Sequence, residues 1–413
     1  MKETKFKQTE VGLIPSDWEV VRLNDSVMFL DSQRIPIKDS DRKKMTGHYP
    51  YYGASGIIDY VDKYIFDDDL ILLGEDGANI IDRSSELAFV IHGKCWINNH
   101  AHVLKPNEDF NIDYLANYLE SLKYDQYNTG TAQPKLNRDK CGIIPIVKPP
   151  LEEQKHIAQA LSDVDAVIST TEKLIAKEKA LKQGAMQTLL SGKMRIQNGK
   201  WIKTTNFKQT ELGPIPQEWN FIQFGQKATI VRGGSPRPIQ NYLTNRTDGI
   251  NWIKIGDVKL GDKYITTTEE KIIPEGKSRS REVHSGDFIL SNSMSFGRPY
   301  ILKLDGCIHD GWLAIQNYQE TFDTDYLYYL LGSDDVFKQY IAMAAGSSVQ
   351  NLNKEKVSKL QVPLPSKPEQ TAIATVLSDM DSEIAALETK LAKYRTLKTG
   401  MMQQLLTGKI RLV

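Results

Sequence analysis

The chain has 413 residues and carries 52 Lys and Arg side chains against 52 Asp and Glu, so its formal net charge is zero at neutral pH. The length allows two to four domains, and a hydrophobic content of 40% excludes disordered and collagen-like proteins. No apolar run approaches the ~20 residues that a membrane helix needs, and three widely spaced cysteines form no disulfide framework. We therefore expect a soluble cytoplasmic protein with no membrane partner. If it binds nucleic acid, it does so through local patches or beside a basic partner.

The sequence contains an internal repeat. Residues 6–18 recur at 207–219 with nine of 13 positions identical, and residues 154–196 recur at 370–412 with 21 of 43 identical. The offsets are 201 and 216, and the regions between the matching ends show little identity. A duplication that kept its ends while its middles diverged predicts a shared frame that holds two independent binding modules. A tandem duplication with drifting loops is the simpler alternative.

The first variable region, residues 24–129, is predicted to be mixed α/β. The apolar run Leu70–Leu73 behind an acidic turn indicates a buried strand, and residues 114–122 have helical spacing. His100 and His102 alternate as a metal pair would, but no third ligand is nearby, so structural or DNA-contacting histidines are favoured. The candidate DNA contacts in and just after this region are Arg34, Lys43, Tyr51, Arg83, Gln133 and Lys135.

In each copy the second of the two repeated segments predicts a long helix, from about residue 151 and again from about residue 366. Prolines stand at both starts, Ser366 and Glu369 fit a capping box, and Gly192 and Gly408 stand where glycine stops a helix. Roughly 40 residues at ~1.5 Å each give a helix about 60 Å long.

These helices also carry an apolar stripe with heptad-like spacing, repeated at the 216 offset. In the first copy it comprises Ile157, Leu161, Val164, Ile168 and Ile175. We expect the two helices to pack on each other as an antiparallel pair with the variable regions at opposite ends. The stripe weakens at Lys182 and Lys398, which predicts polar helix ends that are free for another partner. A helix buried in a core is the alternative explanation of such a stripe.

The second variable region, residues 225–345, is also predicted to be mixed α/β, with a buried strand at 288–290 and helical spacing over 326–340. It has two arginine-bearing loops in which small residues separate the basic ones. Such loops let the backbone approach a phosphate while arginine reaches a base edge, although most charged loops are simply solvated. The candidate DNA contacts here are Arg232, Ser235, Arg237, Lys277, Arg279, Arg281, Arg298 and Gln350.

Motifs for catalysis are scarce. There is no phosphate-binding Gly-x-x-x-x-Gly-Lys-Ser/Thr loop and no Gly-x-Gly-x-x-Gly. The turn with which aminomethyltransferases hold their substrate is also absent, and the cysteines show no zinc spacing with histidine. Glu-x-Lys triplets, which could form half of a metal-dependent nuclease site, begin at Glu3, Glu269 and Glu388. A chain with this charge density contains several such triplets by chance. We expect no catalytic residues and no metal site in this chain.

The assembled motifs resemble those of the specificity subunits of type I restriction–modification systems. The resemblance rests on Gly-x-Ile-Pro-x-x-Trp at 12–18 and 213–219, on Gly-Thr-Ala-Gln-Pro-Lys-Leu-Asn at 130–137, and on Gly-Ser-Ser-Val-Gln-Asn-Leu-Asn at 346–353. Pro-Leu-Glu-Glu-Gln ending at 154 and Gly-Gly-Ser-Pro-Arg ending at 237 also match. The likeness spans the chain, while the first variable region departs from it with Tyr-Tyr-Gly-Ala-Ser-Gly ending at residue 56.

The resemblance implies a non-catalytic subunit that binds double-stranded DNA. Residues 1–150 and 201–365 would be target recognition domains, each reading one half of a bipartite asymmetric site. Residues 151–200 and 366–413 would form the helices that set the spacer and dock two methyltransferase subunits. Those partners would carry S-adenosylmethionine, and restriction subunits with ATP and Mg would join them.

Two other classes of protein remain as alternatives. A scaffold with two protein-binding modules on a coiled-coil spacer keeps the repeat but predicts no salt-dependent affinity for DNA. A nuclease or methyltransferase contained in one chain predicts turnover by the purified protein, and the missing motifs argue against it.

Overall fold

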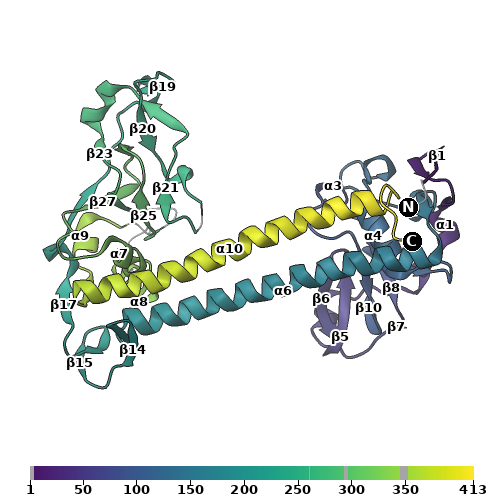
Figure 1. The fold of residues 1–413 in the computed structure, drawn as a ribbon, viewed down its shortest axis with the longest axis horizontal. Helices are drawn as coiled ribbons and strands as arrows, with labels where there is room; N and C mark the ends of the chain where they lie inside the picture. The colour runs from purple at the N-terminus through teal and green to yellow at the C-terminus, as the bar shows by residue number, and fades with distance from the viewer. Residues whose placement is uncertain (1–3, 260, 293–295, 345–351) are drawn as a thin grey trace. The chain divides into compact units, whose positions relative to one another are not determined.

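The computed structural model describes residues 4–259, 261–292, 296–344 and 352–413. The chain separates into two compact units, which we call unit 1 (Met1–Lys173 with Thr389–Val413) and unit 2 (Leu174–Glu388). Each unit therefore combines one variable region with parts of both long helices (Figure 1). No helix in the described segments is both long and apolar enough to cross a membrane.

Two four-stranded sheets form the variable part of unit 1, in the orders β6-β5-β10-β7 and β4-β11-β8-β9. The strand predicted at Leu70–Leu73 is confirmed as β8 and is buried along its whole length, as expected for a strand covered on both faces. The unit contains strands β1 (Phe6–Thr9), β2 (Gly12–Pro15), β3 (Glu19–Arg22), β4 (Val27–Phe29), β5 (Thr46–Gly53), β6 (Gly56–Val61), β7 (Phe66–Asp67), β8 (Leu70–Gly74), β9 (Ala88–Ile91), β10 (Lys94–Ile97), β11 (Ala101–Pro106) and β12 (Pro145–Lys148), and helices α1 (Leu23–Ser26), α2 (Asp39–Arg42), α3 (Asn79–Asp82), α4 (Ile112–Ser121) and α5 (Arg138–Gly142).

Two five-stranded sheets form the variable part of unit 2, in the orders β18-β27-β24-β25-β21 and β19-β22-β20-β26-β23. The helical spacing over 326–340 corresponds to two helices rather than one, because Gly332 and Ser333 interrupt the helical conformation. The unit contains strands β13 (Met194–Gln197), β14 (Lys200–Lys203), β15 (Phe207–Thr210), β16 (Gly213–Pro216), β17 (Asn220–Gln223), β18 (Thr229–Arg232), β19 (Leu243–Thr244), β20 (Ile250–Ile253), β21 (Tyr264–Ile265), β22 (Glu270–Ile272), β23 (Arg281–Val283), β24 (Phe288–Ser291), β25 (Pro299–Leu302), β26 (Gly306–Ile308), β27 (Trp312–Gln316) and β28 (Gln361–Leu364), and helices α7 (Thr324–Leu331), α8 (Asp334–Ala344) and α9 (Lys354–Ser358).

The long helices are α6 (Leu151–Leu190) and α10 (Lys367–Leu405), and they pack together in antiparallel directions. In unit 1 Asp165 pairs with Lys398 and Glu172 pairs with Arg395. In unit 2 Asp381 pairs with Lys182 and Glu388 pairs with Lys179, which occupy the equivalent positions at the 216 offset, with lysine at 179 in place of arginine at 395. The prediction of free polar ends at Lys182 and Lys398 is wrong, because both lysines form ion pairs across the helix pair.

The apolar stripe has two roles along each helix. The first turns of α6, at Ile157 and Leu161, are part of the hydrophobic core of unit 1. The first turns of α10, at Ile373 and Leu377, enter the core of unit 2 in the same way. The core-helix reading therefore holds for the start of each helix, and the ion pairs just described join the two helices farther along.

A buried cluster, repeated in both units, fixes each N-terminal segment to the frame. In unit 2 the Arg195 side chain donates from Nε and Nη2 to Glu369, at 2.8 Å each, and the Trp219 indole donates to the same carboxylate at 3.1 Å. In unit 1 the corresponding residues are Arg411, Glu153 and Trp18. Glu369 is thus used by this cluster, and not by the capping box that the sequence suggests.

Candidate nucleic-acid interface

Three loops of unit 2 meet at one end of its sheets. The loop after β18 donates a hydrogen bond from Gly233 to the Trp312 carbonyl at 2.9 Å, and another from Gly234 to the Ile308 carbonyl at 3.1 Å. A Cβ at Gly233 would lie 2.0 Å from the His309 carbonyl oxygen, so this approach requires glycine. The turn between Ile308 and Trp312 is the second loop. The third loop carries Ser280, whose hydroxyl donates to the Gly234 carbonyl of the first loop at 2.8 Å.

This meeting brings together basic residues that are distant in the sequence. Arg232 ends β18 and Arg237 lies on the loop that follows it, while Arg279 and Arg281 flank Ser280 at the start of β23. The Arg281 Nε atom lies 3.5 Å from the Arg232 carbonyl, and the Arg279 guanidinium lies 5.8 Å from the centre of the Tyr242 ring. The two arginine-bearing loops predicted separately therefore form one basic surface.

Asp310 contacts two of these arginines, Arg232 and Arg237. Its Oδ1 accepts from the Ser235 hydroxyl at 2.7 Å, and its Oδ2 lies 3.2 Å from the Arg237 Nη2. Its backbone carbonyl accepts from the Arg232 Nε at 3.2 Å and from the buried Asn292 side chain at 2.8 Å. The hydrogen bond from Ser235, followed by further hydrogen bonding and nearby positive charge, lowers the pKa of the Asp310 carboxyl below its ordinary value despite partial burial.

A pocket of about 850 Å³ opens beside Arg237. It combines cationic donors with an acidic acceptor, since the Lys254 Nζ lies 3.0 Å from Glu270 and both residues line the wall. The His309 ring also lines it and lies 6.3 Å from the buried Trp252 ring. Side-chain donors and acceptors are the groups that read the edges of base pairs. Neither Lys254 nor Glu270 was predicted to contact DNA, because a lysine just after a strand and a glutamate within one carry no signal that they face a pocket.

The remaining candidates of unit 2 lie apart from this centre or are already paired. Lys277 forms an ion pair with Glu282 at 2.6 Å. Arg298 precedes β25, and its backbone pairs with that of Ser291. Gln350 falls within residues 345–351 and so lies outside the described residues.

The candidates of unit 1 include one compact ionic cluster. Glu75 accepts from Arg34 at 2.7 Å and pairs with Lys135 at 3.2 Å, so it joins two predicted contacts that are 101 positions apart. Arg34 also donates to the Ala101 carbonyl at 2.7 Å, and its side chain is only 13% exposed, whereas that of Lys135 is 48% exposed. Lys135 is therefore placed to reach a ligand, and Arg34 mainly holds the loop that carries it.

His102 lies under this cluster. Its Nδ1 bonds Asp31 at 2.7 Å and its Nε2 bonds the Leu136 carbonyl at 2.7 Å. Burial opposes the charged ring, but the hydrogen bonds and charges of Asp31 and Cys141 together outweigh it and raise the pKa of His102 to about 10. The buried thiol of Cys141 is adjacent, and burial raises its pKa too. This Cys–His–Asp set is no nucleophilic site, because the Cys141 thiol is fully buried and burial disfavours its thiolate form.

Other predicted contacts of unit 1 are dispersed. Lys43 is exposed on the surface and pairs with Asp39, and Gln133 is exposed in the turn before Lys135. Arg83 pairs with Glu120 at the end of α4. Tyr51 is 2% exposed, and its hydroxyl accepts from the Ile37 N–H at 3.1 Å, so it belongs to the core rather than the surface.

The histidine pair does not form a shared metal site. His100 is exposed and bonds Asp76 at 2.9 Å, whereas His102 is buried, so the two rings do not face one ligand. Across the described residues, no group of three His, Cys, Asp or Glu side chains is arranged to hold a metal ion.

Comparisons with known proteins point the same way. A family model described as the type I restriction modification DNA specificity domain matches residues 15–179 and 216–393. The chain is 27% identical to the type I restriction enzyme MjaVIII specificity subunit of Methanocaldococcus jannaschii, over 99% of this chain and 97% of the relative. It is 22% identical to the EcoDI specificity subunit of Escherichia coli, over 97% and 90%.

Solved structures share the fold. The specificity subunit from M. genitalium superposes with a TM-score of 0.57 at 12% identity and covers 97% of this chain and 98% of its own. A second chain comes from a study of complex assembly and conformational transition of the type I restriction–modification system. It gives the same TM-score at 16% identity and covers 96% of this chain and 99% of its own.

Proposed function

We propose how this chain, which belongs to the family of type I restriction–modification DNA specificity subunits, reads its target. Like the family, it is a non-catalytic subunit with two mixed α/β domains on a long helix pair. Each domain reads one half of a bipartite, asymmetric site in double-stranded DNA. The observation that carries this proposal is the meeting of three loops around Asp310, which gathers Arg232, Arg237, Arg279 and Arg281 on one surface.

The helix pair is proposed to fix the gap between the two half-sites. Support comes from the ion pairs that repeat in both units, Asp165–Lys398 with Asp381–Lys182, and Glu172–Arg395 with Glu388–Lys179. Such pairs hold the axial register of two antiparallel helices. Two readers on one face of B-DNA require half-site centres about one turn, ~10 bp, apart. We therefore expect two short, unlike half-sites with a fixed unread gap.

Two methyltransferase subunits are proposed to dock on a surface that both copies share. Leu181 and Leu397 are 50% and 51% exposed and occupy equivalent positions. One helical turn farther stand Gly184 and Gly400, inside their helices, although such a glycine costs about 1 kcal/mol relative to alanine. A Cβ at either glycine would meet no atom of this chain within 4 Å, so nothing in the described chain requires glycine there.

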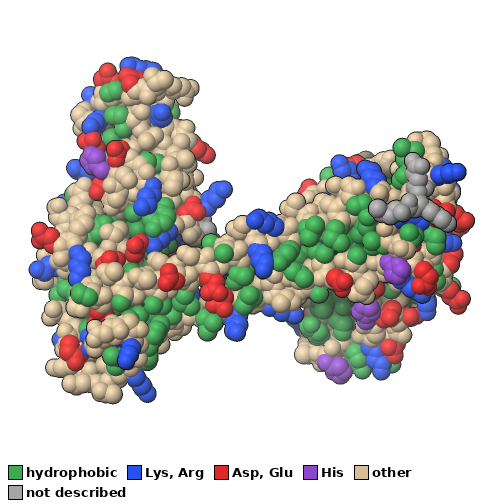
Figure 2. All heavy atoms as spheres, in the orientation of Figure 1, with side chains coloured by type: hydrophobic (Ala, Val, Ile, Leu, Met, Phe, Trp, Pro, Cys, Tyr) green, Lys and Arg blue, Asp and Glu red, His purple; other side chains and the backbone are tan. Residues whose placement is uncertain are grey.

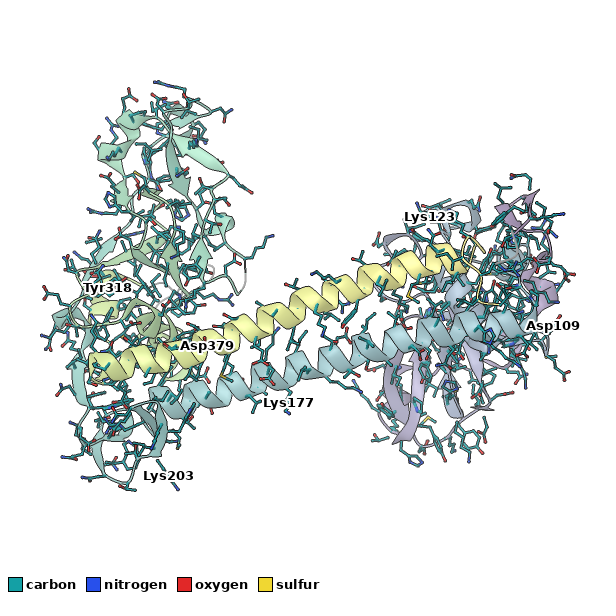
Figure 3. The ribbon with its side chains drawn as sticks, in the orientation of Figure 1. Asp109, Lys123, Lys177, Lys203, Tyr318 and Asp379 are labelled. Atoms are coloured by element: carbon teal, nitrogen blue, oxygen red, sulfur yellow. The ribbon has the colours of Figure 1, made fainter. Side chains whose placement is uncertain are left out.

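A partner that approaches the helix closely would explain both the retained glycine and the exposed leucine. Lys177 lies on the same exposed side of α6, facing away from α10 (Figure 3), and Lys393 repeats it. A groove lies beside the last turns of each long helix and contains Met402 and Gln403 in unit 1, and Met186 and Gln187 in unit 2. Its volume is about 1120 Å³ in unit 1 and 490 Å³ in unit 2. An equivalent surface in each copy suits two copies of one partner.

The partners are proposed to supply the chemistry and part of the DNA contact. Methyltransferase subunits would bring S-adenosylmethionine and methylate adenine, and restriction subunits would bring ATP and Mg for cleavage. Acidic and basic side chains are interspersed over the visible face of this chain (Figure 2), in keeping with its zero net charge. The partners would therefore complete a positive clamp around the DNA in the cytoplasm.

Co-expression of this chain with the methyltransferase gene that neighbours it, followed by long-read mapping of methylated adenine, tests the proposal. A split motif with a fixed gap is the expected result. A stable complex that methylates no DNA and shows no salt-dependent DNA affinity would contradict the proposal and favour the protein scaffold. Omitting this chain provides the control, because the methyltransferase alone should then produce no split motif.

A further inference from the structure

The Asp310 carboxylate is unusual in its place on a surface that would face DNA. A negative charge repels phosphate, and the Asp310 side chain is 38% exposed beside Arg237. Its two oxygens are nevertheless occupied by this chain, since Oδ1 takes the Ser235 hydroxyl and Oδ2 takes Arg237. The carboxylate is therefore engaged in ordering its neighbours.

Asp310 is itself held firmly from below. The buried Asn292, 2% exposed, donates to the Asp310 carbonyl, and the Asn292 N–H bonds the adjacent Gly311 carbonyl at 3.0 Å. The Ser235 hydroxyl both donates to the carboxylate and accepts from the Asp310 N–H at 3.4 Å. The chain of contacts runs from a buried side chain through Asp310 to the exposed loop, which is how a rigid scaffold fixes a flexible side chain.

Arg237 is the side chain that gains most from this support. It is 79% exposed and lines the pocket that Lys254 and Glu270 share. A free arginine loses considerable rotamer entropy when it binds, and one ion pair with Asp310 restricts the fork in advance. One Nη2 hydrogen bond still leaves donors for a bidentate contact. The base that accepts such a contact is guanine, through O6 and N7 in the major groove.

We propose that Asp310 is a positioning residue that holds Arg237 ready to read a guanine in the half-site of the second domain. This rests on the proposed function, because it assumes that the three loops contact DNA. Asp310 acts through Arg237 and Ser235 and does not itself touch the base.

The test uses the complete complex with its methyltransferase partner and compares the wild type with Asp310→Asn. The amide keeps the shape of the side chain and its bond with Ser235 but loses the charge that holds Arg237. We expect one position of the second half-site to become degenerate while the first half-site is unchanged. Affinity for the cognate site should fall roughly 5- to 30-fold, between the loss of side-chain ordering and the loss of a full bidentate contact. The salt dependence of binding should stay the same, because no phosphate contact is removed.

Two further variants separate positioning from a structural role. Asp325→Asn is the matched control, since Asp325 is a half-exposed carboxylate of the same unit that pairs with Lys263 at 2.7 Å; it should leave the motif intact. Arg237→Ala combined with Asp310→Asn should be no worse than Arg237→Ala alone. Additive effects, an unchanged motif, or a uniform loss of binding on all sequences together with a lower melting temperature would each overturn the inference.

The same data separate failure of the proposed role of Asp310 from failure of the proposed function. If the wild-type complex yields a split motif and Asp310→Asn yields the same motif, only the role of Asp310 is refuted. If the wild-type complex binds no DNA, the proposed function fails and this inference fails with it.

Discussion

Replacing Arg411 by alanine should destabilise unit 1 while leaving unit 2 unchanged, although the two residues that Arg411 pairs with lie 258 and 394 positions earlier in the chain. The Arg411 guanidinium donates to Glu153 at 2.6 and 2.7 Å, and Glu153 is 2% exposed. Without Arg411, the bond from the Trp18 indole at 3.0 Å is the one hydrogen bond that this carboxylate keeps among the described residues.

The expected loss in the free energy of unfolding follows from the contacts that Arg411 makes. Removing one partner of a buried ion pair costs about 3–5 kcal/mol, because the remaining charge is left uncompensated. The second pair, with the half-exposed Asp17, adds less than about 1 kcal/mol. The N-terminus of α6 offsets part of the loss, roughly 0.5–1 kcal/mol, because Glu153 lies in its first turn. A net loss of about 2–5 kcal/mol in the free energy of unfolding corresponds to roughly 4–20 °C for a unit of this size.

Hydrogen exchange measured by mass spectrometry is the suitable assay, because it reports on the two units separately. Exchange in β3 and α4 should accelerate in Arg411→Ala, and exchange in β24 and β27 should not. Arg195→Ala is the matched variant, since Arg195 makes the equivalent contacts with Glu369 in unit 2, and it should give the reverse result. A loss below 1 kcal/mol, or equal losses in both units, would refute the reasoning.

Four other outcomes are expected. The pKa of His102 is raised to about 10 from an ordinary 6.5, so its contribution to stability is present below about pH 6.5 and is lost as the pH rises through 10. Urea unfolding of unit 1 should show this fall in the free energy of unfolding with pH, and His102→Gln should remove it. Leucine at Gly184 or Gly400 should leave the melting temperature nearly unchanged but weaken binding of one methyltransferase subunit, as measured by the mass of the complex; binding of both at wild-type affinity would remove the glycines from the docking surface. Four residues inserted into both long helices, about one turn, should lengthen the unread gap in the methylated motif or abolish methylation, whereas an unchanged gap would show that the helices are no ruler. Arg279→Ala should weaken binding or relax one half-site by ~1–3 kcal/mol, and unchanged affinity and preference in a binding titration would demote it to a solvated side chain.

The frame was largely predictable from the sequence, because its determinants are local. Proline before Leu151 and glycine after Leu190 bound α6 almost where the structure does, and apolar spacing indicated that the helices pack. The two hairpins follow from the repeated segment and have the same register, Phe6 opposite Pro15 and Phe207 opposite Pro216. Local sequence signals do not predict the ion pairs of Lys182 and Lys398. Their acidic partners are determined by the alignment of two helices that are distant in the sequence.

The interface was predictable only in part. Small residues between arginines indicated two loops of unit 2, but not that both would meet at the Ile308–Trp312 turn. Asp310 gave no signal of its own, since a single aspartate after a histidine is common. Tyr51 was misjudged because an aromatic residue beside a polar loop reads the same whether its ring faces solvent or the core.

The buried clusters interlock the two repeats, since Glu153 of the first is neutralised by Arg411 of the second, and Glu369 of the second by Arg195, which follows the helix of the first. Gly408 likewise fits under Pro15 and Trp18 as Gly192 fits under Pro216 and Trp219. Neither repeat can therefore be traded whole between relatives without breaking contacts that belong to the other. The described residues of the variable segments between these buried clusters make no such contacts with the other repeat. Genetic exchange would be expected to preserve the frame and to shuffle the variable segments, so that a new DNA specificity can arise in one recombination step.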